Sequence, residues 1–328
     1  MLIAIYLHLV EFNLVQIGLF LSAALAGAAV YTLSIMFVCD TLGRRRLLIA
    51  FAIILAGASA MVASMEQFPV LIAVAFLGAF SVAGGGAAGA MQPLEQSSLS
   101  ETVAEGQRTD LYAIYGIMGT GDWRLPSSRL IFTLSGLFSV DHFAGGLVAQ
   151  SLVSLWFFTK CGIKLESIAL IFFGSNLIAA VSLWVAAKLA NRIGLINTMV
   201  ITHIPASVML IAIPFLPKAG MAASFWLVRS FFGQMDVPTR QPYTMAVVGP
   251  NERSPMAGVN SATMSVTGTV SPSVATALWN IGATSIPFVS CGVLKISYDL
   301  ALWFMFRKVK PPEKARRAAR AGAGDSRG

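Results

Sequence analysis

Residues 39–49 read "CDTLGRRRLLI" and place three consecutive arginines, one aspartate and one glycine between two long apolar runs. The runs on either side cover residues 15–38 and 47–65. Each is long enough for a helix to cross the roughly 30 Å hydrocarbon core of a bilayer. The stretch is therefore interpreted as a short charged loop between two membrane-spanning helices, and it predicts a helical membrane protein.

The composition of the whole chain indicates the same class. Of its 328 residues, 56% are hydrophobic and 12% are charged, whereas soluble domains have about 25% charged residues. Residues 1–12 are apolar but too short to span a bilayer. We predict an all-α polytopic membrane protein with about nine transmembrane helices, over residues 15–38, 47–65, 69–90, 130–158, 168–190, 198–216, 222–248, 259–280 and 286–306.

The segment between the third and fourth predicted spans is mostly polar. It contains one apolar stretch, "LYAIYGIMG" at residues 111–119, which as a helix covers about 14 Å, roughly half of a bilayer. We expect this stub to lie on the membrane or dip into it without crossing. Most basic loop residues then fall on one side, which the positive-inside rule makes the cytoplasmic side.

The net charge of +8 comes largely from the C-terminal tail, where seven Lys and Arg lie within residues 307–320. A basic tail beside a final apolar segment is typical of a cytoplasmic juxtamembrane flank. No interleaving of aromatic and basic residues points to nucleic acid. The expected partner is the lipid bilayer, with the C-terminus cytoplasmic.

Two parts of the sequence repeat in the same order. Residues 93–113 align with residues 238–258 without gaps, and identical residues fall at Pro93/Pro238, Gln96/Gln241, Val103/Val248 and Arg108/Arg253. About fifty residues upstream of each copy, "DTLG" at 40–43 is mirrored by "NRIG" at 191–194, again between two spans. The pattern predicts two parallel repeats.

The charged loop and the repeats resemble the major facilitator superfamily of secondary transporters. Asp40, Gly43, Arg44 and Arg45 match that family's loop signature, while Met36 and Thr41 depart from it. Residues 229–253 resemble the tenth helix of the family and the loop that follows it. The resemblance implies two six-helix halves with the solute bound between them near the midplane.

Against that pattern the nine spans correspond to the second to fourth and seventh to twelfth helices, so we expect an incomplete member of the family. The expected parts are an N-terminal half at residues 1–120, a linker at 121–129, a six-helix half at 130–306 and a basic tail at 307–328. By resemblance, the cytoplasmic motif and gate consist of Asp40, Gly43, Arg44, Arg45, Asp236, Arg240 and Arg253.

Ionisable residues inside spans are costly and mark candidate sites. Asp141 and His142 lie near the middle of the run at 130–158, and Gly145 and Gly146 follow and are expected to loosen the helix. Together with Gln150, this pair is a candidate for binding the solute or carrying a proton. The alternative is a polar pair that caps a helix break or binds a neighbouring helix.

Further charged residues lie in the later spans. Arg229 suits an anionic solute or a buried partner such as Asp141, and Gln234 lies on the same run. Asp236 and Arg240 are four residues apart, as are Lys295 and Asp299, so each is expected to form a pair within its helix. The isolated His8 and His203 are expected to be structurally satisfied.

The predicted function is transmembrane movement of a small solute by an alternating-access transporter in the plasma membrane, with protons as a candidate coupling ion. The alternative is a truncated, non-transporting membrane interaction protein. An intramembrane enzyme is disfavoured, because Asp141 and His142 point about 100° apart on a helix. The three cysteines have no metal-binding spacing, and neither a metal nor a cofactor is expected.

Overall fold

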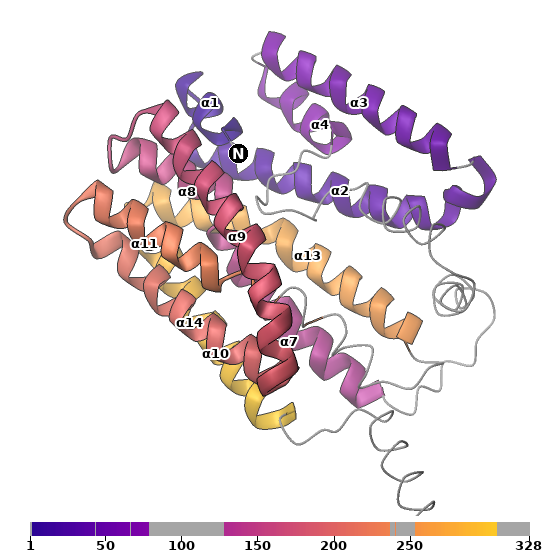
Figure 1. Ribbon diagram of the computed structural model, residues 1–328. Helices are drawn as coiled ribbons and strands as arrows, with labels where there is room; N and C mark the ends of the chain where they lie inside the picture. Colours follow the sequence, from indigo (N-terminus) through magenta and orange to yellow (C-terminus); the bar gives the residue numbers. More distant parts are fainter. Residues whose placement is uncertain are drawn as a thin grey trace, which may run out of the picture.

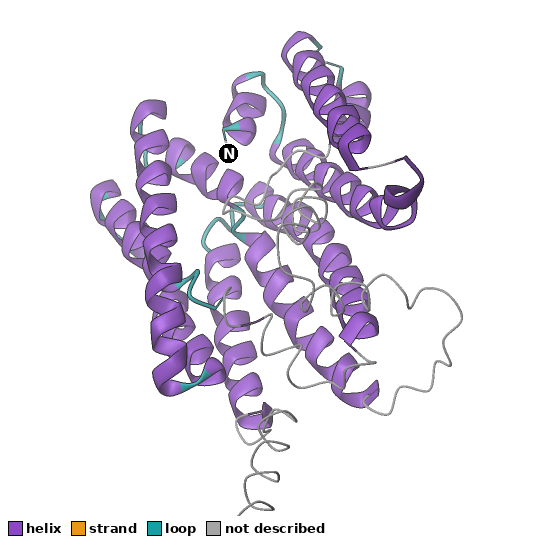
Figure 2. Ribbon diagram, turned by 45° about the vertical axis from the view of Figure 1, so that its right-hand side comes forward, coloured by secondary structure: helices purple, strands orange, loops and turns teal. Residues whose placement is uncertain are grey.

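A computed structural model describes residues 2–42, 44–65, 67–78, 128–236, 240 and 253–306. This part of the chain is entirely helical apart from short connections (Figure 2). The helices are α1 (Ile3–Leu9), α2 (Leu14–Leu42), α3 (Arg44–Ser64), α4 (Phe68–Gly78), α7 (Ser128–Leu147), α8 (Gln150–Thr159), α9 (Leu165–Ile193), α10 (Leu195–Ala212), η2 (Ile213–Phe215), α11 (Ala219–Phe232), α13 (Arg253–Asn280) and α14 (Ile286–Phe306).

Four helical segments are long and apolar enough to cross a membrane: Arg129–Thr159, Leu165–Ile193, Leu195–Phe215 and Ile286–Phe306. They coincide with four of the predicted spans. Helices α2, α3, α4, α11 and α13 overlap the other five predicted spans with different bounds, and the number of nine spans stays a prediction. The predicted stub, the linker at 121–129 and the basic tail lie outside the described residues, so the division into parts stays a prediction.

Helix α13 lies between α2 and α7, while α3 and α4 pack on the far side of α2 (Figure 1). Helix α13 is rich in Gly, Ala, Ser and Thr, which suits its central position, because small residues let neighbouring backbones approach closely. Gly18 of α2 faces Thr276 of α13, and the hydroxyls of Ser22 and Ser273 are hydrogen-bonded at 2.8 Å. Helix α13 thus joins the N-terminal helices to the rest of the bundle.

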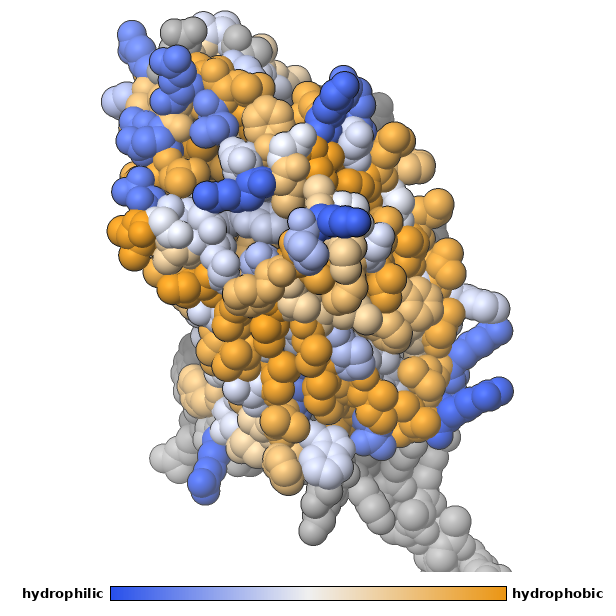
Figure 3. Space-filling view, turned by 90° about the vertical axis from the view of Figure 1, so that its left-hand side faces the viewer, coloured by the Kyte–Doolittle hydropathy of each residue, from blue (hydrophilic) through white to orange (hydrophobic). Residues whose placement is uncertain are grey.

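Many large apolar side chains are exposed on the surface of the helix bundle. Large apolar side chains of α9 stand out from the bundle, with 70% of Leu170, 69% of Phe173 and 64% of Trp184 exposed. Figure 3 shows a broad apolar area on one face of the molecule, with most hydrophilic side chains above it and beside it. Contiguous apolar surface of this extent marks contact with a membrane or a partner.

Gly27 is expected to be essential for the packing of α2 on α4. A Cβ atom at this position would lie 1.8 Å from the backbone carbonyl oxygen of Phe76. Gly27→Ala should therefore cost about 1–3 kcal/mol or more of unfolding free energy, measured as a lower melting temperature of the purified protein. Gly57→Ala is the matched control, since nothing lies within 4 Å of its Cβ position. Equal melting temperatures for the two variants would contradict this packing.

Candidate functional site

The helix that carries Asp141 is interrupted, as its two glycines predict. Helix α7 ends at Leu147 and α8 begins at Gln150. Across the break, the N–H groups of Val148 and Ala149 donate to the carbonyl oxygens of Gly145 and Gly146, each at 3.3 Å. A helix broken inside a span leaves backbone groups available for binding, which is how many transporters form their sites.

Asp141 lies at the centre of a buried group of charged residues. Its side chain is nearly inaccessible to solvent. One carboxylate oxygen accepts a hydrogen bond from Nζ of Lys295 at 2.5 Å, and the other accepts one from the guanidinium of Arg240 at 2.6 Å. Arg240 also donates to Asp236 at 2.5 Å. We refer to Asp141, Asp236, Arg240 and Lys295 as the charge network.

The charge network joins three parts of the bundle that are far apart in sequence. Asp141 comes from α7 and Lys295 from α14, while Asp236 and Arg240 follow α11. Within these four residues, two carboxylates face two cations, so their formal charges cancel. The guanidinium of Arg240 also lies over the ring of Phe138, 5.2 Å from its centroid, which adds a cation–π contact. Cancellation and close contacts offset the large cost of removing four charges from water.

The expected pair of Asp236 and Arg240 is confirmed, but the pair predicted within α14 is wrong. Lys295 binds Asp141 on α7, and Asp299 binds His203 on α10, with Nδ1 and Oδ1 3.1 Å apart. Spacing by four residues places Lys295 and Asp299 on one helix face. Because that face packs against both α7 and α10, each residue takes a partner from a neighbouring helix. Spacing within one helix carries no information about those partners.

Arg229 has no carboxylate partner among the described residues, and the suggested pairing with Asp141 is wrong. Its guanidinium lies over the indole of Trp226, 4.7 Å from the ring centroid, and its buried Nε has no hydrogen-bond partner. The thiol of Cys291 lies close enough to interact electrostatically with both Arg229 and Lys295. Arg229 is thus an uncompensated cation on the same side of α14 as the charge network.

The other predicted solute-binding residues lie around this region without joining the network by hydrogen bonds. His142 is half-buried and interacts electrostatically with Arg240 and Asp141. Gln150 is buried in the first turn of α8, and Gln234 is half-buried in the turn after α11. Among the described residues, neither amide forms a side-chain hydrogen bond, so both have free capacity for a ligand.

Of the predicted cytoplasmic motif, the structure describes only the backbone of Asp40, Arg44 and Arg45. Asp40 lies in the last turn of α2, and Arg44 and Arg45 open α3. Gly43 lies outside the described residues, as do the side chains of the other three. Arg253 is the first residue of α13, and its side chain is likewise not described. The role of these residues as a cytoplasmic motif and gate stays a prediction.

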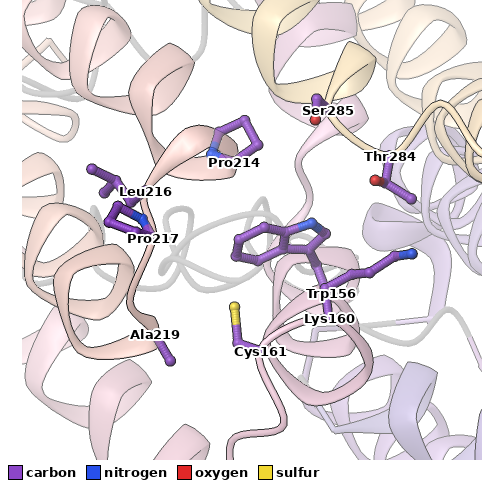
Figure 4. Close-up of a pocket in the computed structure, with 9 residues that line it drawn as sticks. All are labelled: Trp156, Lys160, Cys161, Pro214, Leu216, Pro217, Ala219, Thr284 and Ser285. Carbon is purple, nitrogen blue, oxygen red and sulfur yellow. The ribbon is translucent and has the colours of Figure 1, made fainter.

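A separate pocket of about 300 Å³ lies where α8 ends and where α11 and α14 begin. Trp156 lies between the segment of Pro214, Leu216 and Pro217 on one side and Thr284 and Ser285 on the other (Figure 4). None of the predicted solute-binding residues lines this pocket. Sequence reasoning missed it, because its lining comes from three connections that are distant along the chain.

Comparison with known proteins supports the membrane assignment without giving a family. The sequence matches none of the established protein-family profiles. It is 25% identical over 118 residues to the uncharacterized membrane protein YJR124C of Saccharomyces cerevisiae, a match that covers 36% of this chain and 26% of the yeast protein. The chain thus spans about a quarter of the length of that relative. With its apolar helices and this distant likeness, the chain is a helical integral membrane protein.

Proposed function

We propose that this protein moves a small solute across a membrane by alternating access, as secondary transporters of the major facilitator type do. The observation that carries the proposal is the charge network, which holds α7, α14 and the segment after α11 together inside the bundle. Charged residues within membrane spans are rare and by default mark a functional site.

Stability alone is a poor reason to keep such a network. Replacing buried ion pairs by apolar residues of similar volume is often neutral or stabilising. Ion pairs between different helices can instead break and re-form as packed elements move between two arrangements. We infer that the contacts of Asp141 with Lys295 and Arg240 hold one of these arrangements closed.

The chemistry of the solute follows from Arg229. Among the described residues this guanidinium has no carboxylate partner, and a guanidinium can form two parallel hydrogen bonds to a carboxylate or another planar anion. The indole of Trp226 beneath it supplies an apolar surface. We propose a small organic anion as the solute, with His142, Gln150 and Gln234 as further binding residues, while Asp141 keeps the closing contacts inferred above. The proposal includes nine spans in two parallel repeats, a plasma-membrane location and a cytoplasmic C-terminus.

The test is solute counterflow in liposomes that contain the purified full chain. Vesicles loaded with an unlabelled monocarboxylate, dicarboxylate, amino acid or sugar are diluted into the same solute carrying a radioactive label. We expect saturable uptake for at least one carboxylate and none in protein-free vesicles. Folded protein that moves no member of the panel would contradict the proposal.

A further inference from the structure

A second buried polar pair lies beside the charge network. His203 of α10 and Asp299 of α14 approach to 3.1 Å, and their side chains are only 4% and 0% exposed. In the described part of the chain, the other carboxylate oxygen of Asp299 and the hydroxyl of Tyr298 are buried and have no hydrogen-bond partner. The ring of Tyr298 packs edge-on against the imidazole, with centroids 6.4 Å apart.

The charged groups around this pair are few and identifiable. Asp141 faces the pair from α7, with His142 next to it in sequence, and Lys295 lies one turn before Asp299 on α14. Asp236 and Arg240 interact electrostatically with Tyr298. Cys291 and Arg229 lie further along, beside Lys295. Helix α13 carries a charge only at its first residue. The charged residues of α9 are exposed, namely Glu166, Lys188 and Arg192.

Among the residues that the structure describes, Asp299 has no permanent cation as a partner. Lys295 is held by Asp141 at 2.5 Å, and Arg240 is held by Asp141 and Asp236. A carboxylate buried beside a neutral imidazole is a net negative charge in a membrane protein, which costs several kcal/mol. One bound proton removes this imbalance, because imidazolium and carboxylate then form a neutral pair.

We propose that His203 and Asp299 form a proton-binding site whose occupancy decides whether Lys295 is bound by Asp141 alone or shared with Asp299. With the proton bound, His203 neutralises Asp299, and Lys295 stays on Asp141 as observed. When the proton leaves to water, the charged carboxylate of Asp299 competes for Lys295, which lies on the same helix face. The contact between α7 and α14 then weakens, which couples the proton to helix movement.

Proton binding can be tested without any solute. The chain has three histidines, so each can be followed by nuclear magnetic resonance of histidine-labelled, detergent-purified protein. Exposed His8 serves as the internal reference. We expect the signal of His203 to respond differently to pH in Asp299→Asn than in the original protein. The matched control, Glu166→Gln, removes an exposed carboxylate and should change nothing. If the signal of His203 responded to pH in Asp299→Asn as it does in Glu166→Gln, the proposal would be overturned.

Coupling to transport rests on the proposed function and is tested separately in liposomes. With the membrane potential held at zero, a gradient of one pH unit is worth about 1.4 kcal/mol per proton and supports up to about tenfold accumulation of an anion moved with one proton. We expect Asp299→Asn and His203→Gln to abolish accumulation while counterflow persists. Melting temperatures establish that each variant is folded, and Asp299→Glu should restore part of the accumulation.

The two proposals fail in different ways. Proton binding that depends on Asp299, without transport of any solute, would refute the proposed function and leave the proton site standing. Unchanged accumulation in both variants, with counterflow intact, would refute the coupling role and leave the transport function standing.

Discussion

Replacing Asp141 by asparagine is expected to lower the free energy of unfolding by about 3–5 kcal/mol, the usual cost of breaking a buried ion pair from one side. The substitution keeps the size of the side chain and removes its charge. Lys295 then loses the only carboxylate it contacts among the described residues, while Arg240 keeps Asp236. The measurement is unfolding of the detergent-purified protein by heat and by denaturant.

A second substitution separates the lost charge from the lost shape. Asp141→Asn combined with Lys295→Met removes the stranded cation, and the remaining pair of Asp236 and Arg240 is neutral again. We expect the double variant to recover at least half of the lost stability, because an unpaired buried charge costs more than a missing pair. Glu166→Gln, on the exposed first turn of α9, should stay within about 0.5 kcal/mol of the original protein. If Asp141→Asn were as mild as this control, the network would not hold the helices together.

Four of the predicted spans are helices long and apolar enough to cross a membrane, because the length of an apolar run can be read directly from the sequence. Residues 286–306 form α14 with the predicted bounds. Gly145 and Gly146 were expected to loosen their helix, and a break lies directly before α8. Loop charge and apolar run length are local properties, and the bilayer imposes the same length on every span. Local sequence is therefore enough to identify these elements.

The partners of the buried charges were not predictable to the same degree. The pair of Asp236 and Arg240 follows from spacing alone, whereas Asp141 with Lys295 joins residues separated by 154 positions. His203 and Asp299 likewise come from different helices. From the sequence, His203 was expected to be structurally satisfied and Asp299 to pair with Lys295. Which helix faces which is decided by packing of small residues, such as Gly18 against Thr276. A single sequence contains no pairing rule for such contacts.

Arg229→Met is expected to have the opposite effect on stability from Asp141→Asn, together with a severe loss of transport. The Nε atom of Arg229 is buried, and the described part of the chain gives its guanidinium no carboxylate, so removing its charge should leave the free energy of unfolding unchanged or raise it. If Arg229 binds the anionic solute, the lost charge-assisted hydrogen bonds are worth about 1.5–3 kcal/mol. The KM of counterflow should then rise roughly 10- to 100-fold.

Two further variants decide whether Arg229 acts on the solute or on the fold. Arg229→Lys keeps the charge but loses the planar pair of donors, so its KM should lie between those of the original protein and Arg229→Met. Arg192→Met removes an exposed arginine from the last turn of α9 and should leave the KM unchanged. A loss of stability in Arg229→Met comparable to that of Asp141→Asn would make Arg229 a structural residue. A stable Arg229→Met variant with impaired counterflow would instead place the arginine in the solute path. Residues that lower the stability of a fold are usually kept because the activity of the protein requires them.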